Sequence, residues 1–239
     1  MTPTLQKKLV IAIDGPAGAG KSTIAARLAR EFGYTNIETG AMYRALALKA
    51  IESDISVDDE TALLKLARNS RIELEPTLEG NRVLLGGRDV SQRIRERDVT
   101  EAASRVSVHP QVRGWMVARQ QDMGAAGGVV MEGRDIGTKV FPDADVKVFL
   151  DADPEVRGER RYRQQNIVGQ SVHGPTRQSG PPQTAAIMAQ MRERDQRDRT
   201  RANSPLIPAA DAVVIDSTKL SIDDVLKRIR EVILSRAAD

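Results

Sequence analysis

A glycine-rich segment that directly follows a short apolar run constrains the fold of this chain more than any other feature. Residues 15–22 read Gly-Pro-Ala-Gly-Ala-Gly-Lys-Ser and match the pattern G-x-x-x-x-G-K-[ST] without a mismatch. The apolar run at residues 9–13 predicts a buried strand, and residues 22–32 show the apolar spacing of a helix. A strand, a glycine-rich loop and a helix in this order predict a phosphate-binding loop, or P-loop.

The pattern predicts a task for each part of this loop. Glycines let the backbone N–H groups turn inward around a phosphate, and the helix that begins near Lys21 adds the positive end of its dipole. We expect Lys21 to reach the β- and γ-phosphates of a nucleoside triphosphate, and the Ser22 hydroxyl to bind Mg²⁺. The residues expected to hold the triphosphate are Gly15, Pro16, Ala17, Gly18, Ala19, Gly20, Lys21, Ser22 and Thr23.

A P-loop alone does not distinguish an ATPase, a GTPase, a motor or a kinase. The sequence contains no Asn-Lys-x-Asp segment of the kind that reads guanine. It also contains no run of several apolar residues that ends in Asp-Glu, as many ATPases have. Other residues must therefore reveal what accepts the phosphoryl group.

The order of the remaining elements favours the α/β class, with a three-layer P-loop fold around a central parallel sheet of five strands. We expect the strands at residues 9–13, 34–37, 129–131, 146–150 and 212–215. Helices are expected at residues 22–32, 42–51, 154–165, 184–199 and 221–236, the last with Ser221 as its N-cap. The whole chain, residues 1–239, is expected to form a single P-loop domain.

Two segments depart from this alternation of strands and helices. Residues from about 56 to 125 predict helices at 58–68, 98–108 and 110–123 around a hairpin with strands at 71–75 and 82–85 and turns at Gly80-Asn81 and Gly86-Gly87. This segment is expected to be an α/β insertion. Residues 166–183 are rich in Gly and Pro and predict a mobile loop.

Composition excludes several classes of function. The chain has no Cys, so it has no disulfide, thiolate zinc site or cysteine nucleophile. Aromatic residues make up 3%, too few for a surface that stacks single-stranded bases, and the net charge is only +3. No apolar run approaches the length of a signal peptide core or a membrane span. We expect a cytoplasmic protein without a membrane or nucleic-acid partner.

Arginine stands out at three places besides the P-loop. Residues 38–44 and 132–135 each follow a predicted strand, where ligands bind in open parallel sheets. Residues 192–201 carry five arginines near the end of a predicted helix. Such a run is by itself typical of a solvated charged face, but the chain has 27 Arg against 9 Lys, and Arg suits bidentate binding of phosphate.

These segments resemble bacterial cytidylate kinases in content and order. The resemblance rests on residues 15–23, Thr-Gly-Ala-Met-Tyr-Arg at 39–44, Gly-Arg-Asp at 133–135, and Glu-Arg-Asp at 193–195 with the residues up to Arg201. Further matches are Ala-Ala-Ser at 102–104, Pro-Gln-Val-Arg at 110–113, Pro-Leu at 205–206, Ala-Ala-Asp at 209–211 and Asp-Ser-Thr at 216–218. The family pattern differs at Glu38, where Asp is more usual, and at residues 169–183, which are longer and richer in Pro.

The resemblance implies a role for each matching residue. Thr39, Arg44 and Arg134 would hold the acceptor phosphate, whereas Ser104 and Arg113 would contact the cytosine ring. By themselves, without the resemblance, these last two residues would better fit a pair on a helix surface. Near the acceptor phosphate and sugar the resemblance places Arg194, Asp198 on the ribose hydroxyls, and Arg201, with Asp135 beside them. ATP would also meet Arg160 or Arg161, and the catalytic residues would be Lys21, Arg194 and Arg201.

The implied activity is Mg²⁺-dependent transfer of the γ-phosphoryl group of ATP to CMP or dCMP, by a monomer. Residues 56–125 would be the monophosphate-binding insertion, and residues 157–185 would be a lid over ATP. Two alternatives remain open. One is a kinase for another small molecule, although the long stretch between Arg44 and Arg134 disfavours an acceptor such as shikimate. The other is a P-loop protein that binds nucleic acid.

Overall fold

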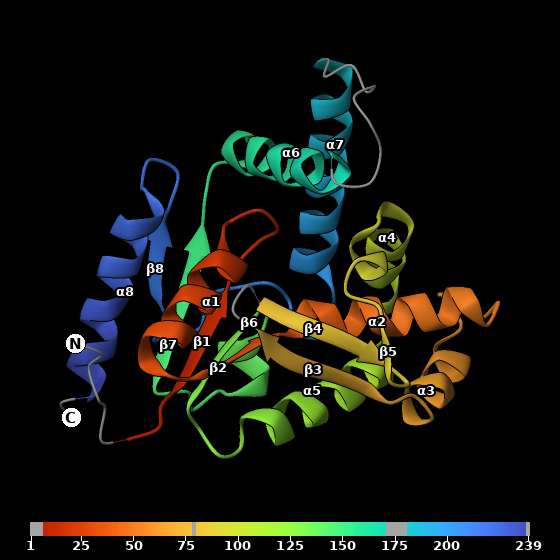
Figure 1. Cartoon of the computed structure of the whole chain (residues 1–239), viewed down its shortest axis with the longest axis horizontal. Helices are drawn as coiled ribbons and strands as arrows, with labels where there is room; N and C mark the ends of the chain where they lie inside the picture. The colour runs from red at the N-terminus through yellow and green to blue at the C-terminus, as the bar shows by residue number, and fades with distance from the viewer. Residues whose placement is uncertain (1–6, 78–79, 171–180, 238–239) are drawn as a thin grey trace.

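The strand that leads into the P-loop lies at the centre of a five-stranded sheet (Figure 1). The computed structural model describes residues 7–77, 80–170 and 181–237. Strand β1 (Val10–Asp14) pairs with β6 on one side and β7 on the other, and the strand order is β2-β6-β1-β7-β8. Every pair is parallel, which confirms the predicted sheet. The other strands are β2 (Thr35–Glu38), β6 (Val129–Gly133), β7 (Val146–Asp151) and β8 (Val213–Asp216).

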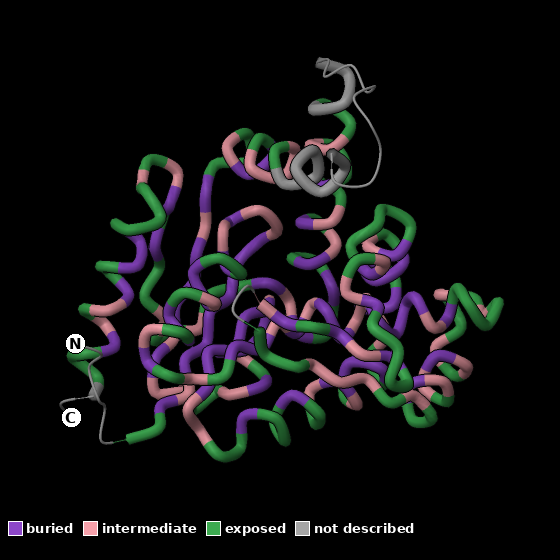
Figure 2. Tube along the Cα trace, in the orientation of Figure 1, coloured by how far each residue is buried: buried purple, intermediate pink, exposed green. Residues whose placement is uncertain are grey.

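Side chains of β1 alternate between two hydrophobic cores, so the sheet is covered on both faces. Ile11 and Ile13 pack with helices α1 (Lys21–Phe32) and α8 (Ile222–Ala237), whereas Ala12 joins the core on the opposite face. That second face is covered by α5 (Pro110–Gly124) and a short π-helical turn, η2 (Ile136–Val140). The three-layer α/β architecture is therefore confirmed, and Figure 2 shows buried positions concentrated along these strands.

Residues between β2 and β6 build a second small sheet with its own core. Antiparallel strands β3 (Ile72–Thr77), β4 (Gly80–Leu85) and β5 (Arg88–Asp89) form this sheet. Helices of the same segment pack on this sheet and form its core. The buried positions include Leu46 of α2, Leu63, Val99 and Met116 of α5. The helices concerned are α2 (Thr39–Glu52), α3 (Glu60–Arg68), a 3₁₀ turn η1 (Arg93–Arg95) and α4 (Arg97–Val106).

One buried amide joins the two sheets. Asn81 Nδ2 donates to the Asn36 carbonyl at 2.8 Å, and Asn81 Oδ1 accepts from the Glu38 N–H at 2.8 Å. The side chain thus satisfies backbone groups on the outer edge of β2 that no strand covers. The sequence analysis placed Gly80 and Asn81 in a turn, which is wrong, because both lie in β4. The predicted turn at Gly86-Gly87 is confirmed, and both glycines have a positive φ.

Two long helices lie over the end of the sheet where the P-loop emerges (Figure 1). Helix α6 (Pro154–Gln170) and helix α7 (Pro181–Thr200) extend into the segment 166–183 that was expected to be a loop. That expectation is wrong at both ends, and residues 171–180 of it lie outside the described residues. The N-cap at Ser221 is confirmed by a bond of 3.1 Å from the Asp224 N–H to Ser221 Oγ. No helix in the described ranges has the length and apolar character needed to cross a membrane.

Replacing Asn81 by Ala should cost stability at the junction of the two sheets. The change leaves the Glu38 N–H and the Asn36 carbonyl without partners in a site where Asn81 is only 6% exposed. We expect the free energy of unfolding to fall by about 2–4 kcal/mol, measured as a lower midpoint of urea unfolding at an unchanged m-value. Asn69→Ala, at the exposed C-cap of α3, is the matched control. An equal loss in both variants would contradict the role given to Asn81.

Candidate active site

Backbone geometry explains the glycines of the P-loop. Gly15, Gly18 and Gly20 have φ angles of 145°, 77° and 96°, a region that other residues rarely adopt. A Cβ atom at Gly15 would also lie 2.0 Å from the Leu150 carbonyl oxygen on β7. Gly20 is the N-cap of α1, so the loop passes directly into the helix. The structure thus confirms the predicted succession of strand, loop and helix.

Lys21 is buried against the loop that precedes it. Its Nζ donates to the Pro16 carbonyl at 2.7 Å. Burial, followed by the nearby Arg134 guanidinium, lowers the pKa of Lys21 to about 7. The ammonium group therefore lies in an environment that disfavours its charge until an anion is added.

Ser22 lies beside a buried acid. Burial and then the neighbouring Glu38 raise the pKa of Glu132, whereas the nearby Ser22 hydroxyl opposes this shift. Glu132 Oε1 has no protein partner among the described residues. A hydroxyl and a carboxylate with a spare oxygen are the hard donors that Mg²⁺ prefers, and Mg²⁺ needs few protein ligands when phosphates and water supply the rest. These residues therefore fit the predicted metal role of Ser22.

Asp14, the last residue of β1, ties the P-loop to the segment after β6. Its two carboxylate oxygens accept from the Ile136 and Gly137 N–H groups, each at 2.8 Å. Burial raises the pKa of Asp14 to about 6, against the effect of these two hydrogen bonds. The contact holds residues 133–135 beside the P-loop. Sequence reasoning missed this role because Asp14 lies between the apolar run at 9–13 and the P-loop pattern and belongs to neither.

Basic side chains from four segments gather next to Lys21. Arg44 of α2 pairs with Glu38, and Arg134 Nε donates to Asp198 of α7 at 2.9 Å. Burial, then Arg134 and, to a smaller extent, Arg44 and Arg161 lower the pKa of Arg194 on α7 to about 10. Arg161 of α6 likewise has a lowered pKa, through burial and then through Arg44. We call Lys21, Arg44, Arg134, Arg161 and Arg194 the cation cluster.

Thr39 also faces this region and is fixed by β6. Its hydroxyl donates to the Glu132 carbonyl at 2.8 Å, and the residue is buried at the start of α2. The three residues expected to hold an acceptor phosphate, Thr39, Arg44 and Arg134, are thus brought to the carboxyl ends of β2 and β6. Arg95 of the insertion, which the sequence analysis did not single out, lies 3.6 Å from Glu38 and adds another cation.

A second charged network lies deeper, between the insertion and α7. Arg113 contacts Asp135 and donates to the Ser107 carbonyl at 3.0 Å, and its guanidinium lies 5.6 Å from the centre of the Tyr43 ring. Arg201 lies 3.8 Å from Asp135 and 3.6 Å from Asp198. Arg113 is 3% exposed and Ser104 is 4% exposed, so the alternative of an exposed helix-surface pair is wrong.

The two arginines proposed for ATP have different surroundings. Arg160 donates to the Ser217 hydroxyl at 3.0 Å and to the Ser217 carbonyl at 2.8 Å, beside the loop after β8. Only Arg161 belongs to the cation cluster. Sequence reasoning also missed Arg157, which donates to the Ala17 carbonyl of the P-loop at 3.1 Å and to Asp195 of α7 at 2.5 Å. Its position in a basic helix gave no indication of burial.

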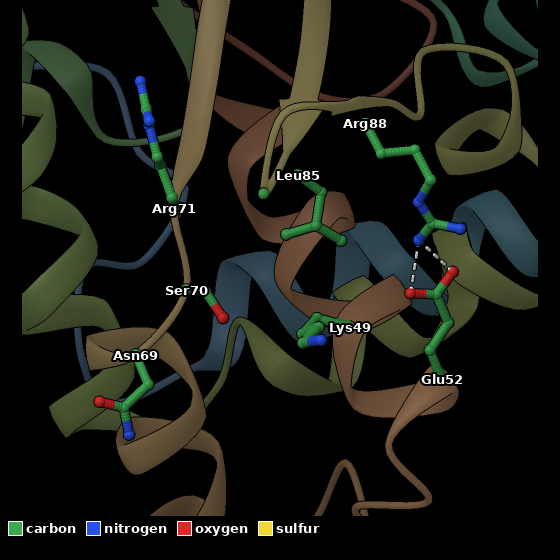
Figure 3. A pocket seen from close by; sticks show the side chains of 8 residues that line it. Lys49, Glu52, Asn69, Ser70, Arg71, Leu85 and Arg88 are labelled. Carbon is green, nitrogen blue, oxygen red and sulfur yellow. Dashed lines mark hydrogen bonds and ion pairs between the residues drawn. The ribbon is translucent and has the colours of Figure 1, made fainter.

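A polar hollow of about 300 Å³ lies away from these residues, between α2, the end of α3 and the β-hairpin (Figure 3). Arg88 closes one side of it through two bonds of 2.6 Å to Glu52, and Lys49 points toward its interior. None of the residues expected to bind nucleotide lines this hollow. The predicted site residues instead converge where the P-loop, α6, α7 and the insertion meet.

Comparisons with known proteins show the family of this chain. The family model for cytidylate kinase matches residues 11–235. A cytidylate kinase from Solibacter usitatus is 48% identical and covers 100% of this chain and 98% of its own length. Those from Geobacillus kaustophilus and Pasteurella multocida are 45% and 44% identical, and cover 97% and 93% of this chain and 99% and 93% of their own lengths. This chain therefore belongs to the cytidylate kinase family.

Proposed function

We propose that this chain transfers the γ-phosphoryl group of ATP to CMP or dCMP, giving ADP and CDP or dCDP. The observation that carries the proposal is the cation cluster, which lies between the P-loop and the buried pair Ser104 and Arg113. Five buried or half-buried cations repel one another, and two phosphate-bearing ligands would relieve that repulsion. The family relationship supports the identity of the acceptor.

On the donor side, residues 15–23 hold the triphosphate of ATP. The backbone N–H groups of the loop and the start of α1 face the phosphates, and Lys21 exchanges its bond with the Pro16 carbonyl for phosphate oxygens. Ser22, with Glu132 behind it, holds Mg²⁺. When bound, this ion neutralises charge on the β- and γ-phosphates.

On the acceptor side, the residues divide by the part of CMP that they meet. Thr39, Arg44 and Arg134 bind the phosphate, and Ser104 and Arg113 bind the cytosine ring. Asp198 binds the ribose hydroxyls, and Asp135 holds Arg113 and Arg201 in place from between them. CMP would therefore contact side chains that are already held in place by bonds to one another.

The reaction requires alignment and charge neutralisation more than a base, because the acceptor is already a phosphate oxygen. Lys21, Arg194 and Arg201 act as the catalytic residues by stabilising negative charge on the transferred group. We further propose that residues 56–125 close over CMP and residues 157–185 close over ATP, which excludes water from the site. The protein works as a monomer in the cytoplasm, without a nucleic-acid or membrane partner.

A panel of acceptors tests the proposed reaction. With ATP and Mg²⁺, we expect CMP and dCMP to be phosphorylated faster than UMP, AMP, GMP or shikimate, measured as ADP formation. Faster turnover of UMP or AMP would overturn the acceptor assignment. Absence of turnover with every acceptor, together with tight binding of nucleic acid, would instead support the nucleic-acid alternative.

Neighbouring arginines on α6 should differ in their effect on catalysis. Single-turnover phosphoryl transfer by Arg161→Ala should slow by about tenfold or more, because a cation near the transferred phosphate is lost. Arg160→Ala, which loses contacts to Ser217, is the matched control and should show a smaller change in this rate. Unchanged transfer in both variants would remove both arginines from the ATP site.

Binding of ATP should be coupled to proton uptake by Lys21. Because the pKa of Lys21 in the free protein is about 7, this amine is mostly neutral at pH 8 and must gain a proton beside phosphate. Calorimetry of a non-hydrolysable ATP analogue in buffers of different ionisation enthalpy should show uptake of roughly 0.5–1 proton at pH 8. The Lys21 contribution should decline below pH 7. Lys21→Arg, which stays charged, should bind without this uptake, and equal uptake in both proteins would exclude Lys21 as the source.

A further inference from the structure

One contact between helix α7 and the insertion is made by Arg197, which lies next to Asp198. Arg197 Nη1 donates to Ser104 Oγ of α4 at 2.8 Å, and Arg197 Nη2 donates to Glu193 Oε1, one turn earlier on α7, at 2.7 Å. Figure 1 shows the lower half of α7 descending beside α4. The guanidinium is therefore held on its own helix while it reaches across to Ser104.

This contact determines how the Ser104 hydroxyl can bind anything else. A guanidinium has no acceptor, so Ser104 Oγ must accept the bond from Arg197. The Ser104 proton finds no acceptor among the described residues, although the residue is only 4% exposed. Positive charge beside Oγ also makes its proton a better donor and makes the remaining lone pair a poorer acceptor. The Ser104 hydroxyl is thus left as a free hydrogen-bond donor for a ligand.

A second unused donor belongs to the same group of residues. Arg113 uses Nη1 for the Ser107 carbonyl and Nη2 for Asp135, while its buried Nε has no partner among the described residues. Ser107 Oγ donates in turn to the Ser104 carbonyl at 2.9 Å. Two neighbouring side chains therefore each have a free donor, and a ligand that offers two acceptors would satisfy both.

We propose that Arg197 is a specificity-determining positioning residue, which makes Ser104 a hydrogen-bond donor and thereby selects cytosine over uracil. This inference rests on the proposed function, with CMP as the acceptor substrate. Cytosine has two adjacent ring-edge acceptors, N3 and O2, and no proton on N3. Uracil carries a proton on N3, and that N–H would face a donor and a positive charge. Rejection of uracil follows from a buried N–H that lacks an acceptor.

The test compares kcat/KM for CMP and UMP in the full-length protein. Arg197→Met keeps an apolar chain of similar length but frees Ser104 from the guanidinium. We expect the ratio of kcat/KM for CMP to that for UMP to fall by about tenfold, because the freed Ser104 hydroxyl can accept a hydrogen bond from uracil N3–H and UMP is then used faster. Arg197→Lys, which keeps a charged donor, should restore part of the ratio. Arg192→Met is the matched control, because Arg192 is exposed on the same helix, and it should keep the wild-type ratio.

A double-mutant cycle separates action through Ser104 from a general structural effect. Ser104→Ala alone should lower the CMP-to-UMP ratio, and adding Arg197→Met should change it no further. A ratio within about twofold of wild type in Arg197→Met would overturn the proposal, as would an undiminished effect of that change in the Ser104→Ala background. If the wild-type protein itself fails to phosphorylate CMP, the proposed function fails instead, so the two failures are distinguishable.

Discussion

Repulsion among buried cations is the constraint on which the rest of this structure depends. Lys21 and four arginines share one end of a parallel sheet, and burial and mutual repulsion lower the pKa of Lys21 and of Arg194. Protein carboxylates compensate part of this charge. Glu38 pairs with Arg44, and Asp198 pairs with Arg134. Within the described part of the chain this compensation is incomplete, because Arg44 Nε and Arg194 Nε are buried without hydrogen-bond partners there. Such unsatisfied donors are what an anion-binding site requires.

The same carboxylates connect parts of the chain that are distant in sequence. Asp198 of α7 is the partner of Arg134 after β6, and Asp135 receives contacts from Arg113 of α5 and Arg201 at the end of α7. Asp14 binds the backbone after β6 directly. The same ion pairs therefore both neutralise the arginines and hold α7 and the insertion against the sheet. A ligand that enters the site therefore competes for groups that also hold these segments together.

Prediction from the sequence succeeded where a local pattern was sufficient. The strands of the central sheet lie within two residues of their expected positions, because parallel strands are short apolar runs. The P-loop was recognisable because three of its positions have positive φ angles that favour glycine. Prediction failed at residues 166–170 and 181–183, where Gly and Pro suggested a loop but the ends are helical. It also failed at Asn81, whose amide replaces a strand partner instead of forming a turn.

The sequence by itself determined the fold class, the P-loop and the family of this protein, because each depends on residue types at short, fixed spacings. The resemblance already grouped several of the 27 arginines, and only the tertiary structure decided which others act with them. Arg157 and Arg197 look like ordinary members of basic helices, yet one supports the P-loop and the other holds Ser104. Arg160 and Arg161 are adjacent in sequence but serve different neighbours. The physical reason is that a guanidinium acts through partners that come from other segments, and sequence spacing says nothing about those distances.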